Sequence, residues 1–212
     1  FTPYEKRAQT MLKAVLTATL ATVSVTAAIC TGAQAAPFKA AQSGTYALEP
    51  THTQVVFSLL HFGFTPYYGL FSEANGTLKL DTAHPAASSL NVSIPVSSVQ
   101  TTSPKLTTEL KEADWFDAAH YPNATFVSSK IVPEGQDGAT ITGTFTLHGI
   151  SHPLTLHAHY VGAGTNPLDK AYTVGFKATG TLKRSDYDVK KYVPLVGDEV
   201  TLTIAGAFEK QP

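Results

Sequence analysis

From about residue 45 onward, apolar and polar side chains alternate with a period of two, the pattern of β-strands with one dry face. Val55, Phe57 and Leu59 share a face in the first clear example. Three further apolar faces follow the same alternation: Leu90, Val92, Ile94 and Val96; Tyr172, Val174, Phe176, Ala178, Gly180 and Leu182; and Val200, Leu202, Ile204, Gly206 and Phe208. Strands that are wet on one side and dry on the other are typical of antiparallel sheets.

Further strand-like runs bring the expected number of strands to eight or more. They lie near residues 45–48, 67–72, 76–81, 124–132, 140–148 and 153–162, and turn residues rich in Gly, Asn and Asp separate several of them. One helix is expected from Ser103 to Ala113, because Ser103 can cap it and Pro104 suits the first helical position.

A sheet of eight or more amphipathic strands in one domain must close into a barrel or fold into two stacked sheets, so that its apolar face is buried. The run 172–184 alone would extend over roughly 43 Å at ~3.3 Å per residue, which is long for a sandwich strand. We therefore expect an all-β domain over 45–210, an extended antiparallel β-barrel of about eight strands with one short helix. The interior of such a barrel either fills with side chains or houses one small ligand.

The N-terminal part of the chain has a different character. Basic residues at Lys6, Arg7 and Lys13 precede an uncharged Ala, Val and Thr-rich stretch, and Ala33 and Ala35 form an A-x-A ending. This pattern predicts a secretory signal peptide over 1–35, with 1–10 as an upstream extension and 36–44 as a flexible segment. A membrane anchor is the alternative, but the stretch is shorter than the roughly 20 apolar residues that a span needs. The mature protein is thus expected to be secreted and not to span the membrane.

Cysteine usage and charge exclude several classes of function. Cleavage after Ala35 would remove Cys30, the sole cysteine, so disulfides, thiolate metal sites and cysteine nucleophiles are excluded from the mature protein. Lipid attachment at Cys30 is an alternative, although Ile29 before it is bulky. The net charge is −1 and no basic patch is evident, so no nucleic acid partner is expected.

Four of the eight histidines lie in the stretch "GTFTLHGISHPLTLHAHY". Alternation places His157 and His159 on the wet face, and His148 and His152 flank a tight turn. A structural zinc site needs four converging ligands, and nothing in this spacing makes the four histidines converge. We interpret them as residues of a solvated sheet face and expect no metal; a surface site at the H-x-H pair is the alternative.

No catalytic motif is found. The sequence lacks a nucleophile elbow, a phosphate loop and a dinucleotide fingerprint. An acid/base trio could be formed by Asp114, Asp117 and His120. These residues follow the expected helix, however, where Asp commonly occurs in caps and turns. We therefore expect a protein that is not an enzyme.

Two residues are candidates for the polar end of a pocket. Alternation directs His61 inward, either as a core histidine bonded to a carbonyl or as a ligand contact. Arg184 is the one arginine that remains after signal cleavage. We expect it to pair with Asp186 or Asp188, and contact with a ligand's polar end is the alternative.

Four ordered motifs resemble the YceI family of periplasmic polyisoprenoid-binding proteins: "YALEPTHTQVVFSLLHFG", "DWFDAAHYPNATFVSS", "GTFTLHGISHPLTL" and "KRSDYDV…VGDEVTLTI". The resemblance covers about 45–210 and implies a lipocalin-like barrel around an isoprenoid lipid or quinone tail. It also implies a periplasmic location and a membrane b-type cytochrome as a partner. The chain departs from many members at Lys105, Thr108 and Glu109 in the helix, and at Asp188, where Gly is usual.

An apolar tail needs an apolar tunnel, because burial contributes roughly 0.8 kcal/mol per CH₂. We expect non-catalytic binding, sequestration or transport of an isoprenoid lipid, with no cofactor apart from that lipid or quinone. Alternatives are an accessory role in a quinone-dependent redox system and a partner-binding module with a filled barrel. The head-group candidates are His61 and Arg184. The expected tunnel lining is Val55, Phe57, Leu59, His61, Phe71, Val92, Ile94, Phe126, Phe145, Leu156, Phe176, Ala178, Gly180, Leu202 and Ile204.

Overall fold

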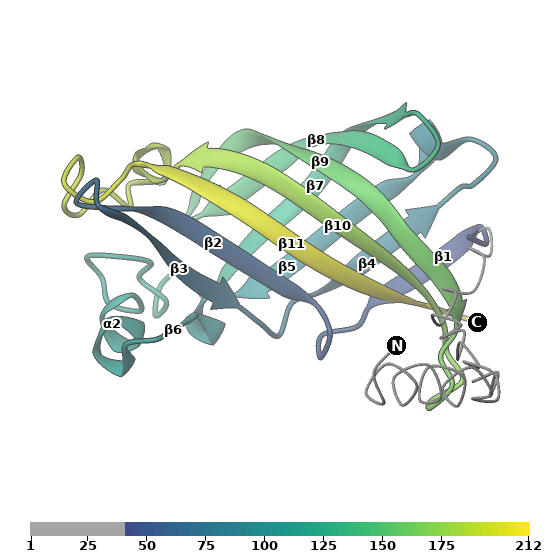
Figure 1. Ribbon diagram of the computed structural model, residues 1–212, viewed down its shortest axis with the longest axis horizontal. Helices are drawn as coiled ribbons and strands as arrows, with labels where there is room; N and C mark the ends of the chain where they lie inside the picture. The colour runs from purple at the N-terminus through teal and green to yellow at the C-terminus, as the bar shows by residue number, and fades with distance from the viewer. Residues whose placement is uncertain (1–40) are drawn as a thin grey trace, which may run out of the picture. The chain divides into compact units, whose positions relative to one another are not determined.

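The computed structural model describes residues 41–212, which form an 11-stranded antiparallel sheet with one α-helix (Figure 1). The signal peptide predicted over 1–35 lies outside the described residues. The strands are β1 Gly44–Leu48, β2 Gln54–His61, β3 Thr65–Phe71, β4 Asn75–Leu80, β5 Ser89–Pro95, β6 Gln100–Thr101, β7 Asn123–Glu134, β8 Gly138–Leu147, β9 Ile150–Thr165, β10 Tyr172–Lys183 and β11 Glu199–Lys210. The helices are α2 Pro104–Glu109 and the 3-10 turns η1 Pro85–Ala87, η2 Val96–Ser98 and η3 Arg184–Tyr187.

Eight of these strands close into a barrel. Their order is β1-β4-β5-β7-β8-β9-β10-β11, and β1 returns to β11 through the pairs Tyr46↔Lys210, Ala47↔Glu209 and Leu48↔Phe208. The predicted all-β, eight-stranded antiparallel barrel is confirmed. The strand β1 begins at Gly44, one residue before the start expected for the barrel. The earlier part of β11, over 201–205, pairs instead with β2, and the sheet continues from β2 to β3 and β6.

The connections between strands gather at two ends. The first, which we call the helix end, carries the hairpin 61–65, the segment 95–123 with α2, the turn 147–150 and the loop 183–199 (Figure 1). The second, the turn end, carries the connections 80–89, 134–138 and 165–172.

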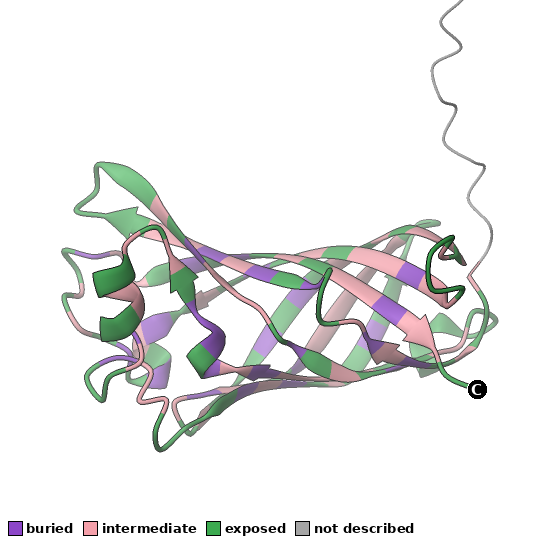
Figure 2. Cartoon of the chain, turned by 90° about the horizontal axis from the view of Figure 1, so that it is seen from below, coloured by how far each residue is buried: buried purple, intermediate pink, exposed green. Residues whose placement is uncertain are grey.

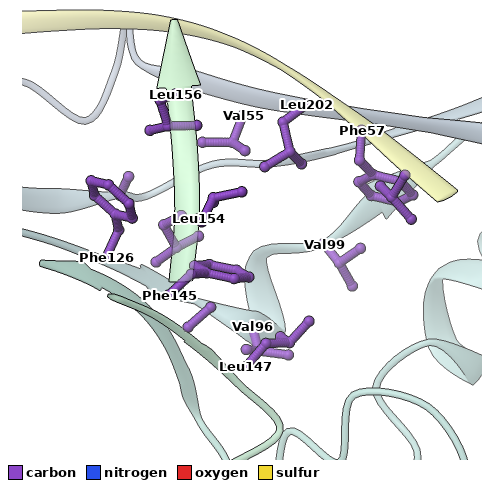
Figure 3. Packing of buried hydrophobic residues seen from close by; sticks show 14 of the residues in the cluster. Val55, Phe57, Val96, Val99, Phe126, Phe145, Leu147, Leu154, Leu156 and Leu202 are labelled. Carbon is purple, nitrogen blue, oxygen red and sulfur yellow. The ribbon is translucent and has the colours of Figure 1, made fainter. Parts of the chain in front are cut away.

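Alternation along the strands sorts side chains between the barrel interior and solvent, as buried and exposed positions in Figure 2 show. In β10, Val174 and Gly180 are buried, whereas Lys177 and Thr179 are exposed. Phe126, Leu156 and Leu202, from three different strands, point toward a common interior in Figure 3. The interior face is therefore the core of the domain.

The helix is shorter than the sequence predicts. The backbone N–H of Leu106 donates to Ser103 Oγ at 3.3 Å, so the predicted N-cap is present. The helix ends at Glu109, not at Ala113, because Leu110 and Trp115 are buried, at 6% and 9% exposure, and the chain turns back to place them over the barrel end. Among the described residues, no helix has the length and apolar character needed to cross a membrane.

Candidate functional site

The barrel encloses a cavity of about 550 Å³. This volume lies within the roughly 300–1,000 Å³ of pockets that hold small ligands. Every strand of the eight-stranded ring contributes to its wall, and nearly all of the side chains in the middle of that wall are aliphatic or aromatic. A barrel filled by its own side chains, one of the alternatives considered, does not describe this interior.

Most of the residues expected to line the tunnel lie in this wall. They are Val55, Phe57, Leu59, Phe71, Val92, Ile94, Phe126, Phe145, Leu156, Phe176, Ala178, Leu202 and Ile204. The strand period of two was sufficient to find them, because each strand presents alternate residues to the interior. The exceptions among the expected lining residues are His61 and Gly180.

The inward placement predicted for His61 is wrong. Its side chain is exposed, and its ring lies edge-on against Phe62 with the centroids 4.3 Å apart. The cause is the position of His61 along β2: regular pairing with β11 spans Gln54 to Ser58, and beyond it Leu60 and His61 pair on this side only with Gly197 and Val196 of the loop 183–199. The hairpin 61–65 lies beyond the cavity, and none of its residues lines the wall. His61 is therefore not available as a head-group contact.

Gly180 is buried but lies beneath Leu156 and not in the cavity wall. A Cβ at this position would lie 2.7 Å from Leu156 Cδ2 and 3.0 Å from the Thr155 carbonyl oxygen. Gly69 and Gly143 have the same relation to aromatic rings, with Cβ positions 2.2 Å from Phe57 Cζ and 2.5 Å from Phe126 Cζ. These glycines therefore give large side chains room to lie against the wall.

The cavity is closed at the helix end and open at the turn end. Leu110, Trp115, Arg184 and Val189 line its closed end, and each is at most 9% exposed. The lining residues at the turn end are exposed and belong to the connections 80–89 and 134–138: Thr82, Pro85, Gly135, Gln136 and Asp137. A ligand would enter at the turn end.

Arg184 is 4% exposed and lies at the closed end. Its Nε donates to the Gly197 carbonyl at 2.9 Å, Nη1 to Val189 at 2.8 Å and Nη2 to Val196 at 2.9 Å. The guanidinium carbon lies 5.9 Å from the ring centroid of Trp115. Burial lowers the pKa of Arg184, and the nearby charge of Asp198 opposes that shift.

The ion pair expected between Arg184 and Asp186 or Asp188 is wrong. Among the described residues Arg184 forms no salt bridge, and Asp188 pairs with Lys190 instead. The 3-10 turn η3 turns Arg184 into the barrel while Asp186 and Asp188 remain exposed. Backbone carbonyls of the loop 189–197 take the place of the carboxylate.

Sequence reasoning missed the other residues of the closed end. Trp115 and Val189 lie in irregular segments, where no periodicity predicts which side chains face inward, and Leu110 directly follows the last residue of α2. The motif "DWFDAAHYP" contains Trp115 and is part of the family resemblance. It marks this segment as characteristic of the family, but it does not predict that the Trp115 side chain lines a cavity.

The acid/base trio does not form. His120 Nδ1 lies 2.9 Å from Asp117, but Asp114 accepts a hydrogen bond from Lys191 Nζ at 2.8 Å. That hydrogen bond, together with the charge of Lys191, lowers the pKa of Asp114. None of these residues lines the cavity.

The four clustered histidines are separated. His148 packs edge-on against Tyr121 and His152 against Tyr187, with ring centroids 4.8 and 5.3 Å apart. His157 and His159 are exposed, as the alternation predicted. Within residues 41–212 no group of three His, Cys, Asp or Glu side chains is placed to hold a metal ion.

Comparison with known proteins agrees with this geometry. The family model of the YceI-like domain matches residues 46–208. Protein YceI of Escherichia coli O17:K52:H18 is 36% identical over 157 residues, covering 74% of this chain and 81% of that protein.

Two solved structures share the fold. The crystal structure of Burkholderia cenocepacia BcnA has a TM-score of 0.68 at 27% identity, covering 76% of this chain and 98% of that chain. A polyisoprenoid binding domain from Saccharophagus degradans, implicated in plant cell wall breakdown, has a TM-score of 0.56 over 80% of this chain and all (100%) of that chain. Its identity is 14%, so this likeness concerns the fold alone.

Proposed function

Since the chain belongs to the YceI-like family, we propose that it binds an isoprenoid lipid in the barrel cavity, as a carrier or sequestering protein and not as an enzyme. The observation that carries this proposal is the apolar cavity of about 550 Å³ inside the barrel. The proposal of an isoprenoid as the ligand is supported by the name of the Saccharophagus degradans polyisoprenoid binding domain, which has the same fold.

The wall supports a hydrocarbon ligand. Transfer from water into an apolar site contributes roughly 0.8 kcal/mol per CH₂, so a five-carbon isoprene unit gains up to about 4 kcal/mol before ordering costs are subtracted. Nearly all of the side chains in the middle of the cavity are aliphatic or aromatic, such as Ile94, Phe126 and Ile204, and an isoprenoid tail that contacts them loses no hydrogen bonds on leaving water.

The periplasm is the proposed location. Its support is the basic, apolar and A-x-A pattern of residues 1–35, which is that of a signal peptide. A carrier in an aqueous compartment between two membranes has to shield an apolar tail from water, and a barrel that surrounds the tail does so. An isoprenoid quinone as the ligand and a b-type cytochrome as the partner both stay predictions.

Extraction of the native protein tests the proposal. Organic extraction of protein purified from its own host without detergent, followed by mass spectrometry, should yield an isoprenoid at about one molecule per protein. In a second arm, stripped protein is titrated with geraniol, farnesol and geranylgeraniol, and affinity should rise with chain length until the cavity is full. An empty native protein that also binds none of the three alcohols at micromolar concentration contradicts the proposal.

A further inference from the structure

The closed end of the cavity holds a buried cation that binding of an apolar tail does not explain. A guanidinium carries five N–H donors. Arg184 uses three of them on the carbonyls of Val189, Val196 and Gly197. One N–H on each terminal nitrogen therefore has no acceptor among the described residues. A buried donor without a partner destabilises the fold, and a charged donor does so more than a neutral one.

The charge of this end is also incompletely matched. Asp198 is the acidic neighbour, but its two carboxylate oxygens accept from Ser185, at 2.9 Å from the backbone N–H and 2.7 Å from Oγ. The Nζ of Lys191 lies 5.8 Å from the Trp115 ring centroid and is paired with Asp114 at 2.8 Å. Arg184 thus forms an ion pair with none of these groups.

The two ends of the cavity differ in sign. Arg184 is the sole lysine or arginine among the residues that line the cavity, and it lies at the closed end. The charged lining residues at the turn end are Asp81 and Asp137, both acidic. A ligand whose head group carries a partial or full negative charge is therefore attracted to the closed end and repelled at the mouth.

We propose that Arg184 binds the head group of the lipid at the closed end, so that the ligand lies head inward with its tail toward the turn end. The head group is of the class that accepts hydrogen bonds, such as a quinone carbonyl or a carboxylate, and it occupies the two remaining N–H groups. This inference rests on the proposed function, since it needs a lipid in the cavity.

Trp115 provides a direct readout of orientation. It is the only tryptophan of the chain and lines the closed end beside Arg184. Bromine quenches indole fluorescence only at close range, so a brominated ligand reports which of its ends lies near Trp115. The probes are 2-bromododecanoic acid and 12-bromododecanoic acid, which differ only in whether the bromine is beside the carboxylate or at the tail end.

With the wild-type protein, 2-bromododecanoic acid should quench Trp115 strongly at saturation and 12-bromododecanoic acid weakly. Equal quenching by the two acids, or stronger quenching by the 12-bromo acid, overturns the head-inward orientation. This measurement needs no variant, so it does not depend on whether an altered closed end folds.

Affinity tests the head-group class. The wild-type protein should prefer farnesoic acid to the hydrocarbon farnesene by roughly 10- to 100-fold, the range expected for hydrogen bonds to a charged group. Arg184→Met should abolish the preference, and circular dichroism checks that this variant is folded. Lys183→Met, which removes an exposed cation beside Arg184, should keep the preference.

If farnesene binds wild-type protein as tightly as farnesoic acid does, the role of Arg184 is refuted, but the binding of the tail is not. Failure of both probes to bind refutes the proposed function as well.

Discussion

Single glycines keep the barrel interior open. Phe57 pairs across strands with Gly69, and its ring covers the place where a side chain would be. Phe126 covers Gly143 in the same way. Because the rings have this room against the wall, less of their volume extends into the cavity. The cavity depends on small residues that do not themselves face the ligand.

Gly143→Ala should lower the free energy of unfolding by about 1–3 kcal/mol, the usual range for overpacking. The added Cβ would lie 2.5 Å from both Phe126 Cζ and the Val127 carbonyl oxygen, and the carbonyl cannot move aside. Gly175→Ala is the matched control, because its nearest contact would be 3.8 Å away. Urea unfolding of both variants measures the difference, and equal stabilities would contradict this account.

Ala178→Trp should abolish lipid binding while the protein remains folded. Ala178 lines the cavity, so an indole here would occupy space that the tail needs. We expect at least a 10-fold loss of farnesol affinity by titration. Thr179→Trp, the next residue and exposed, should bind like the wild type. If Ala178→Trp keeps full affinity, the tail does not lie at this part of the wall.

The strands illustrate how far the sequence predicts structure. The inward positions of β10, such as Val174, Phe176 and Ala178, follow from alternation because a long strand paired on both sides keeps its register. His61 escaped the same rule, because it lies where the loop 183–199 has replaced β11 as the partner of β2 and the cavity has ended, and no local pattern encodes where a cavity ends. Trp115 and Arg184 were set at the closed end by irregular loops, whose geometry comes from tertiary packing.

The turn between β1 and β2 is held by one carboxylate. Glu49 accepts hydrogen bonds from the backbone N–H groups of Thr51 at 2.8 Å and His52 at 2.7 Å. Burial alone would raise the pKa of Glu49, but hydrogen bonds from the side chain and backbone of Thr51, and from the backbone and side chain of His52, outweigh it and lower the pKa from 4.5 to about 2. The turn is where β11 changes partner from β1 to β2, so its geometry sets both pairings.

Glu49→Gln should therefore destabilise the protein by about 1 kcal/mol at pH 7, a value kept small because the partners are exposed to solvent. The lowered pKa means that the carboxylate stabilises the fold above about pH 4.5 and loses this effect as the pH falls toward 2. Chemical unfolding at pH 7, 4 and 2.5 should show that the difference in free energy of unfolding between Glu49→Gln and the wild type becomes smaller as the pH falls. Glu112→Gln, at an exposed position, is the control, and a pH-independent difference for Glu49→Gln would contradict the role of its charge.

The whole barrel is held closed by a short seam. Three residue pairs join β1 to β11, from Tyr46↔Lys210 to Leu48↔Phe208. By contrast, β10 pairs with β11 along its length from Thr173 to Lys183. Opening costs least where the fewest hydrogen bonds must break, so the seam is the weakest part of the ring.

Hydrogen exchange should locate this seam. Backbone amides of Ala47 and Leu48 should exchange faster than those of Phe176 and Ala178 in ligand-free protein. A bound lipid contacts Leu48 and Phe208, both of which line the cavity, and should slow exchange at the seam. Exchange of β1 as slow as that of β10 without ligand would show that the ring opens elsewhere.

The strands that meet at this seam, β1 and β11, lie near opposite ends of the described chain, so the seam can form only late in folding. Hairpins such as β7–β8 and β9–β10 join neighbours in sequence and can form early in folding. Pairing of β1 with β11 closes a loop of nearly the whole domain, which is slow and entropically costly. Until the last strand, β11, has paired with β1, the early hairpins form an open sheet whose apolar face is exposed to water.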